Sequence, residues 1–181
     1  MQKLKTVWLD EEKRTKQIAR TPSGEETAYF GYQRIMADKK TDQVTQHFNS
    51  VARHYDFMNT LLSFGIHHLW KRTAVKMMEL LPGDNVLDVC GGTGDLAVLA
   101  ARAVGPSGQV TIFDINRAMI QAGFHKVSNT DIEDRIQYVQ GNAEDISFPE
   151  ASFDRAMVGF GIRNVTHMQK GFAEMYRVLK P

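Results

Sequence analysis

The segment Asn85–Gly94 reads NVLDVCGGTG, an apolar run with one aspartate that leads directly into glycines at positions 91, 92 and 94. A strand that ends in such a turn lets the backbone pass close to a ligand, because glycine adopts backbone angles that other residues avoid. The amide groups at the start of the following helix then attract a carboxylate or a phosphate. Turns of this type bind phosphates, dinucleotides or S-adenosylmethionine.

The chain beyond Pro82 alternates short apolar runs with helical patterns. Alternation of this kind predicts an α/β fold with a parallel sheet and helices on both faces. We expect strands at 86–89, 110–113, 136–139 and 155–158, and helices at 95–104, from an Asn116 cap to about 127, and at 168–179.

The first 81 residues have a different character. Residues 1–40 are polar and indicate a loosely ordered tail, and 41–81 read as a helical cap ahead of a sheet domain at 82–181. A first helix should start near Thr41 or Asp42, and a second should end at Pro82 after a kinked stretch at 56–65. Their apolar stripes are Val44, Phe48, Val51 and Tyr55 in the first helix, and Trp70, Ala74, Met77 and Leu81 in the second.

Composition limits the class of protein. The 181 residues are 43% hydrophobic and 24% charged, with a net charge of +1, which argues against a dedicated nucleic-acid binder. The only cysteine, Cys90, excludes a disulfide within the chain, and no apolar stretch reaches the ~20 residues that span a bilayer. The start lacks the apolar core of a secretory signal. These features favour a cytoplasmic enzyme or binding domain.

Two acids distinguish between the ligands of the glycine turn. Asp114 ends the second expected strand, twenty residues after Gly94, where a carboxylate accepts from ribose hydroxyls. Asp88 lies in the first strand, where it would repel a pyrophosphate but suit an ammonium or sulfonium cation. The pair therefore favours S-adenosylmethionine over NAD, with Gly92 and Gly94 as cofactor-binding backbone. The alternative role of Asp88 is to satisfy nearby backbone amides.

Asn142 and Ala143 follow the third strand at the same edge of the expected sheet. Asn142 can hydrogen-bond an adenine edge and Ala143 leaves room for the ring, although ordinary turn chemistry explains an asparagine there equally well. The six histidines and one cysteine show no metal-ligand spacing, so we predict no metal site.

Seven segments, in order, resemble one family: YDFMN, SFGIHHLWKR, LDVCGGTGDL, FDIN, GNAEDISFP, FGIRNV and YRVLKP. They are similar to the UbiE-type C-methyltransferases of ubiquinone and menaquinone biosynthesis, and the resemblance runs from about Thr27 to Pro181. It implies a Rossmann-like class I methyltransferase sheet with an N-terminal helical cap, and methylation of a prenylated benzoquinol or naphthoquinol ring. It also implies cofactor contacts at Thr93, Asp114, Asn142 and Ala143. A serine that contacts the cofactor in the family is replaced here by Gly159.

Three residues are candidates for the acceptor side of the reaction. Arg163, with Asn164 beside it, can lower the pKa of a ring hydroxyl, and Tyr55 can point its hydroxyl at the quinol from the cap. The alternatives are a surface ion pair for Arg163 and core packing for Tyr55. We expect His67 and His68 to be structural or surface residues. The apolar side chains at 57, 58, 61, 62 and 64 could line the entry for an isoprenoid tail, but we expect them to be core.

The resemblance also sets the alternatives for function. The family continues beyond Pro181 with two glycines and three further strands, so four of seven strands are expected in this chain. A non-catalytic cofactor-binding or scaffold subunit of a quinone-biosynthesis complex, or a methyltransferase for another small molecule, remain alternatives. A lipophilic quinol is the expected partner, and peripheral contact with the inner face of a membrane and a homodimer are left open.

Overall fold

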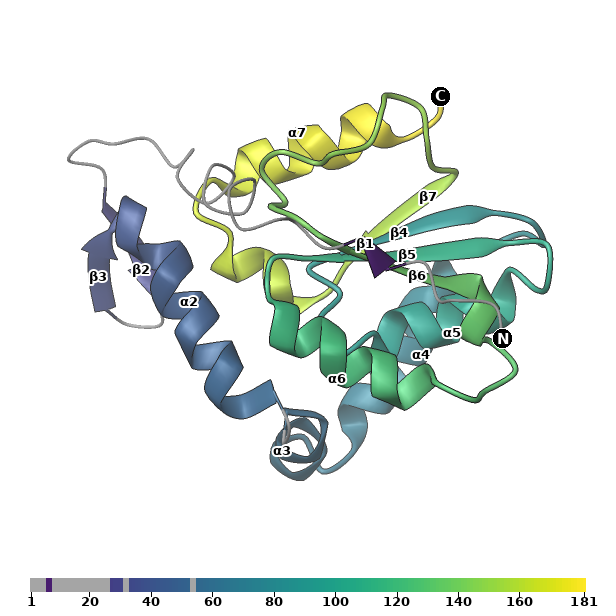
Figure 1. Ribbon diagram of the computed structural model, residues 1–181, viewed down its shortest axis with the longest axis horizontal. Helices are drawn as coiled ribbons and strands as arrows, with labels where there is room; N and C mark the ends of the chain where they lie inside the picture. The colour runs from purple at the N-terminus through teal and green to yellow at the C-terminus, as the bar shows by residue number, and fades with distance from the viewer. Residues whose placement is uncertain (1–5, 8–26, 31–32, 53–54) are drawn as a thin grey trace.

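The computed structural model describes residues 6–7, 27–30, 33–52 and 55–181. Its centre is a parallel sheet with strand order β1-β6-β5-β4-β7, in which β1 is the short strand Thr6–Val7 (Figure 1). The four expected strands are present, which confirms the α/β fold class. They are β4 (Asn85–Val89), β5 (Gln109–Asp114), β6 (Ile136–Gln140) and β7 (Arg155–Val158).

The strand order reverses at β4. From β4 the chain adds β5 and β6 on one side and then returns to place β7 on the other, so that β4 pairs with both β5 and β7. In open parallel sheets ligands bind beyond the carboxyl ends of the strands at such a reversal. The glycine turn that follows β4 lies at this point.

Side chains of β4 alternate between two buried layers. Val86 packs in the layer under α5 (Asp95–Ala103) and α6 (Arg117–Val127), whereas Leu87 packs in the layer under α7 (Met168–Val178). Figure 1 shows α5 and α6 on one face of the sheet and α7 on the other. The sequence placed these helices within a residue or two, including the Asn116 cap, whose side chain accepts from the amide of Met119 at 3.0 Å.

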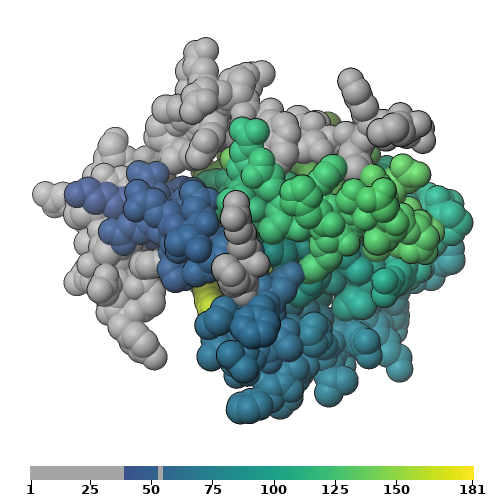
Figure 2. Space-filling view, turned by 60° about the horizontal axis from the view of Figure 1, so that its bottom comes forward, coloured from purple at the N-terminus to yellow at the C-terminus, as the bar shows by residue number. Residues whose placement is uncertain are grey.

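The cap consists of three helices rather than two. They are α2 (Ala37–Val51), α3 (Tyr55–Leu62) and α4 (Ile66–Met77), and two short 3-10 segments, η2 (Glu133–Arg135) and η3 (Phe160–Asn164), complete the described elements. The kinked stretch expected at 56–65 is mostly helix, and Tyr55 begins α3 instead of completing the stripe of α2. In Figure 2 the cap, in blue, lies beside the green part of the chain, and α2 contacts α6.

The expectation of a polar tail through residue 40 needs correction. Strand β1 (Thr6–Val7) pairs with β6, and β2 (Thr27–Phe30) forms a hairpin with β3 (Gln33–Met36) that leads directly into α2. The pairing of β1 joins backbones that lie far apart in the sequence, such as Thr6 and Tyr138, so the polar composition of its segment could not show it. The rest of the expected tail, 1–5, 8–26 and 31–32, lies outside the described residues, and the division into tail, cap and sheet domain stays a prediction.

The apolar side chains at 57, 58, 61, 62 and 64 are exposed, so the expectation that they form core is wrong. No residue of α3 is buried, and Phe64, after its end, is 92% exposed. The stripe expected in the second cap helix is also open, with Trp70, Met77 and Leu81 exposed, whereas α4 buries His67 and Val75. The spacing of the apolar residues showed that they share one face of the helix, but it could not show whether another part of the protein covers that face. In the described part of the chain no helix is long and apolar enough to cross a membrane.

Candidate functional site

A cavity of about 800 Å³ opens at the carboxyl edge of the sheet, between the glycine turn and the cap. Its volume falls within the ~300–1,000 Å³ range of small-molecule sites. Nine of the ten residues singled out from the sequence line it: Tyr55, Asp88, Gly92, Thr93, Asp114, Asn142, Ala143, Arg163 and Asn164. The sequence therefore named residues that the fold brings together from five separate segments.

Gly94, the tenth residue, does not line the cavity. It is the N-cap of α5, with a φ of 77°, and a Cβ built on it would lie 2.6 Å from Cδ1 of Ile112. The left-handed φ and the close side chain both require glycine there. Its role in this structure is to turn the chain into α5, while Gly92, with a φ of 55°, faces the cavity.

Asp114 holds the glycine turn in place. Its Oδ2 accepts from the amide of Gly92 at 2.9 Å, and its Oδ1 accepts from the amide of Asn116 at 2.7 Å. Burial raises the pKa of Asp114 to about 6, although these backbone hydrogen bonds oppose the rise. The carboxylate remains at the wall of the cavity, where the sequence placed a ribose acceptor.

Asp88 is buried beneath the turn. Neither carboxylate oxygen has a hydrogen-bond partner among the described residues, so the alternative of satisfied backbone amides is not what the structure shows. Burial raises the pKa of Asp88 to about 8, and the negative charge of Asp114 adds to the rise. The nearby amide of Ala97 offsets part of this rise, although it does not form a normal hydrogen bond with the carboxylate. A Cβ on Gly91 would lie 2.9 Å from Cγ of Asp88. A cationic ligand nearby would stabilise the charged form.

Asn142 combines the two roles considered for it. Its Oδ1 accepts from the amide of Glu144 at 3.0 Å, which is the ordinary turn chemistry of asparagine. The residue also lines the cavity with Ala143, which is buried. The turn chemistry thus orients a side chain that still borders the site.

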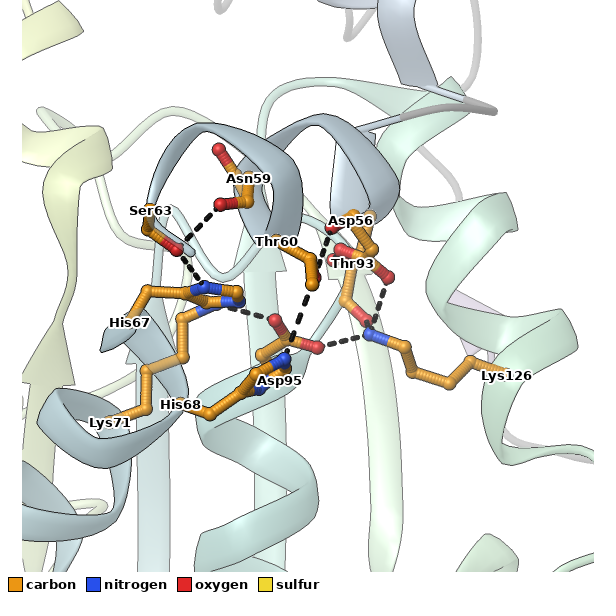
Figure 3. Close-up of polar contacts among 10 residues, drawn as sticks. All are labelled: Asp56, Asn59, Thr60, Ser63, His67, His68, Lys71, Thr93, Asp95 and Lys126. Atoms are coloured by element: carbon orange, nitrogen blue, oxygen red, sulfur yellow. Dashed lines mark hydrogen bonds and ion pairs between the residues drawn. The ribbon is translucent and has the colours of Figure 1, made fainter. Parts of the chain in front are cut away.

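A charged network joins the cap to the glycine turn (Figure 3). The hydroxyl of Thr93 donates to Oδ1 of Asp56 in α3 at 2.7 Å, and Asp56 pairs with Lys126 of α6 at 2.7 Å. Lys126 also pairs with Asp95 at the start of α5, and Lys71 of α4 pairs with Asp95 at 2.5 Å. Two carboxylates and two ammonium groups therefore balance one another around the turn.

His67 is not a surface residue, which was one of the two alternatives expected for it. It is 5% exposed, lines the cavity, and its Nδ1 lies 2.6 Å from Oγ of Ser63. The Ser63 hydroxyl already donates to the carbonyl of Asn59 at 2.7 Å, so it must accept from Nδ1–H of His67. The Nε2 atom then carries a lone pair, and it has no partner among the described residues. His68 is exposed, as expected.

Arg163 and Asn164 lie in η3, directly after β7, and both line the cavity. The guanidinium carbon of Arg163 lies 5.9 Å from the ring centre of Phe160. No ion pair with a described carboxylate holds this side chain, so the surface-pair alternative finds no support in the described part of the chain. Tyr55 borders the cavity from α3, with its ring 5.8 Å from that of Phe48. Tyr55 therefore packs against an apolar neighbour and also lines the cavity.

Sequence reasoning missed the residues that fix the cap. Asp56, Lys71, Asp95 and Lys126 come from four helices, and no local pattern joins them. A signal was present for the cavity face of the cap, because Tyr55, Asn59, Ser63 and His67 are four residues apart and all line the site. No cluster of three or more potential metal ligands occurs among the described residues, and the prediction of no metal stays a prediction.

Comparison with known proteins identifies relatives. A model described as the ubiE/COQ5 methyltransferase family matches residues 36–181. The ubiquinone/menaquinone biosynthesis C-methyltransferases UbiE of Cronobacter sakazakii and of Escherichia coli K12 are each 46% identical over 157 residues. The match covers 87% of this chain and 62% of each relative.

Solved structures share the fold at lower identity. The [4+2]-cyclase SpnF is 18% identical with a TM-score of 0.67, covering 78% of this chain and 57% of that one. A putative S-adenosylmethionine-dependent methyltransferase from Methanococcus maripaludis is 20% identical with a TM-score of 0.63, covering 73% and 59%. These two similarities support the fold alone.

Proposed function

Because the chain belongs to the ubiE/COQ5 methyltransferase family, we propose that it transfers a methyl group from S-adenosylmethionine to a ring carbon of a prenylated benzoquinol or naphthoquinol. The chain spans 62% of the length of the relatives named for ubiquinone and menaquinone biosynthesis. The observation that carries the proposal is that the same cavity is lined by the glycine turn and Asp114 on the donor side and by Arg163 and Tyr55 on the acceptor side. A donor and an acceptor bound there would meet.

The residues around the turn fit the methyl donor. S-adenosylmethionine supplies an electrophilic methyl group on a sulfonium cation when it is bound. Asp88 offers a buried carboxylate without a partner, which suits a cationic ligand better than the two negative charges of a pyrophosphate. Asp114 would accept from the ribose hydroxyls, and Asn142 and Ala143 would border the adenine.

On the acceptor side, the ring must become electron-rich as the new bond forms. A phenol has a pKa of ~10, so its full ionisation at pH 7 costs about 4 kcal/mol. A guanidinium beside the oxygen lowers that pKa by ~1–3 units, and we assign this task to Arg163, which lines the cavity. A water molecule held by Arg163 would accept the hydroxyl proton, with Asn164 and Tyr55 orienting the ring hydroxyl. As the new carbon–carbon bond forms, the bond from the methyl group to the donor sulfur would break and leave a neutral thioether, and return of the ring C–H proton to the oxygen would restore the aromatic ring and its hydroxyl.

The rest of the barrier would fall through alignment. Holding two reactants in line within a closed site is worth up to ~7–11 kcal/mol, and the cap supplies the closed side of this cavity. The polar network at the turn keeps α3 and α4 against α5 and α6. The same closure would exclude water from the reacting atoms.

Two measurements test the proposal. Calorimetry with S-adenosylmethionine should show binding, and methyl transfer to a demethylated hydroquinone with one isoprene unit should follow, in this chain or in a form extended to the length of the relatives. Donor binding without transfer in either form would favour the non-catalytic subunit. Transfer only to an unrelated small molecule would favour the other methyltransferase, and preference for NAD over the donor would refute both.

Arg163→Ala separates catalysis from folding. The variant should lose most turnover, while donor affinity stays within about twofold, because Arg163 is not among the residues proposed to hold the donor. Loss of donor binding and turnover together would make Arg163 structural.

A further inference from the structure

Helix α2 contacts both sides of the cavity. Near its middle, the carbonyl of Thr45 and Oδ1 of Asn49 each accept from Nδ2 of Asn116 at 3.1 Å, next to Asp114 on the donor side. In its first turn, α2 also reaches the segment that carries Arg163, on the acceptor side. One rigid helix therefore connects the two halves of the site.

The connection on the acceptor side is a buried cation. Lys40 is 4% exposed, and its Nζ donates to the carbonyl of Val165 at 3.0 Å and to that of Arg163 at 3.5 Å. Burial lowers the pKa of Lys40, and the negative charge of Glu144 opposes the shift. Burying an ammonium group costs several kcal/mol in proteins unless it is paired, so an apolar residue would serve packing alone at least as well.

Glu144 holds the other end of the same segment. It is 7% exposed, and its Oε1 accepts from the amides of Thr166 and His167, each at 3.0 Å. Its own amide donates to Asn142 at 3.0 Å. The backbone around Arg163 is thus held by a buried ammonium group through its carbonyls and by a buried carboxylate through its amides.

We propose that Lys40, together with Glu144, positions Arg163 for the acceptor ring. The inference rests on the proposed function, in which Arg163 acts on the ring hydroxyl. The Arg163 side chain has no ion pair among the described residues, and its guanidinium lies over Phe160 of the same η3 segment, so the direction of the side chain depends on the backbone of η3. Lys40 does not line the cavity, so it acts through Arg163 and not on the substrate.

Lys40→Met tests the role against a matched control, Lys39→Met, at the exposed neighbouring residue. Since a misplacement of 1 Å costs on the order of 100-fold in rate, Lys40→Met should lower kcat by ~10–100-fold. KM and donor affinity should change less than about threefold, and Lys39→Met should match the wild type. A Lys40→Met enzyme with unchanged kcat would overturn the proposal.

A double-mutant cycle shows whether the effect passes through Arg163. In an Arg163→Ala background, Lys40→Met should cause no further loss of kcat. If the double variant instead lost kcat by the product of the two single factors, the proposal would be overturned. If Lys40→Met does not fold, Glu144→Gln takes its place in the same cycle. Because Glu144 itself lines the cavity, a direct action on the substrate would appear as a further loss in the Arg163→Ala background and would overturn the proposal.

An absorbance readout keeps this test apart from the proposed function. If the wild type binds the donor without transfer, the ultraviolet absorbance of the bound one-isoprene hydroquinone, which reports ionisation of its ring hydroxyl, replaces kcat. Lys40→Met should then raise the pH at which the bound ring ionises when Arg163 is present but not in Arg163→Ala, and an equal rise in both would overturn the proposal.

Discussion

The hydroxyl of Thr93 donates a 2.7 Å hydrogen bond to Asp56, so the cap is attached to the glycine turn at a residue proposed to contact the methyl donor. Asp56 also pairs with Lys126, which places a balanced charge cluster at the joint. Cap closure and donor binding would therefore depend on one another.

Asp56→Ala should loosen α3 and α4. Exposed and half-exposed ion pairs contribute up to ~1 kcal/mol, so hydrogen exchange in these helices should accelerate by about fivefold, with β4 and β5 unchanged. Asp42→Ala, at an exposed position of α2, is the control. Equal exchange in wild type and Asp56→Ala would show that the joint does not hold the cap.

Donor affinity should rise as pH rises from 5.5 to 7.5. Asp114, with a pKa of about 6, and Asp88, with a pKa of about 8, gain negative charge over this range and attract a cation. The upper limit keeps the α-amino group of the donor, whose pKa is ~7.7–8.0, protonated. Calorimetry in two buffers of different ionisation heat should show proton release. A constant Kd would contradict the roles given to both acids.

The same two carboxyls should make the ligand-free protein less stable as pH rises. Their pKa values lie above the ~3.9 of an unfolded aspartate, so the folded state holds protons that the unfolded state has lost. This contribution is fully present below about pH 4 and is lost by about pH 8. Asp88→Asn should remove much of the slope in urea unfolding, and an unchanged slope would assign it to other groups.

Gly159 and Gly161 should respond differently to serine. Gly159 has a φ of −89°, and a Cβ there would meet only Cδ1 of Leu96 at 3.5 Å, whereas a Cβ on Gly161 would lie 2.4 Å from that of Cys90. Gly159→Ser should fold normally and tighten donor binding by ~2–10-fold, since a hydrogen bond is worth ~0.5–1.5 kcal/mol. Gly161→Ser should lower the Tm. Weaker donor binding in Gly159→Ser would reject a serine contact at this position.

The sequence was informative where function depends on local geometry. The glycine turn, Asp114 and the Asn116 cap all follow strands whose alternation is plain, so their meeting at one edge could be predicted. Contacts such as Asp56 with Thr93 and Lys40 with Val165 join residues 37 and 125 positions apart. They depend on how the cap lies on the sheet domain, which no pattern in either segment encodes. The strand pairing of β1 was missed for the same reason.

His67 should be neutral with its proton on Nδ1. Burial lowers its pKa, and the charge of Lys71 lowers it further. The Ser63 hydroxyl donates its proton to the carbonyl of Asn59. Its oxygen can therefore only accept from the imidazole, so Nδ1 of His67 must carry the proton. Long-range ¹H–¹⁵N NMR spectra distinguish the two tautomers and the cation. A protonated Nε2 at pH 7 would mean that the Ser63 hydroxyl points to the ring instead.

Leu62 should matter for the length of the acceptor's tail. It is 73% exposed yet lines the cavity, so it lies where an isoprenoid chain would leave the site for solvent or a lipid surface. Met77 of α4 is 77% exposed and does not line the cavity, which makes it the matched control. Each buried CH₂ is worth ~0.8 kcal/mol, so losing contact with one isoprene unit should cost at least about tenfold. Leu62→Asp should therefore raise KM for a hydroquinone with several isoprene units by ~10-fold or more and leave a tail-less hydroquinone unaffected. Met77→Asp should change neither, and an equal loss with both acceptors in Leu62→Asp would show that the tail takes another path.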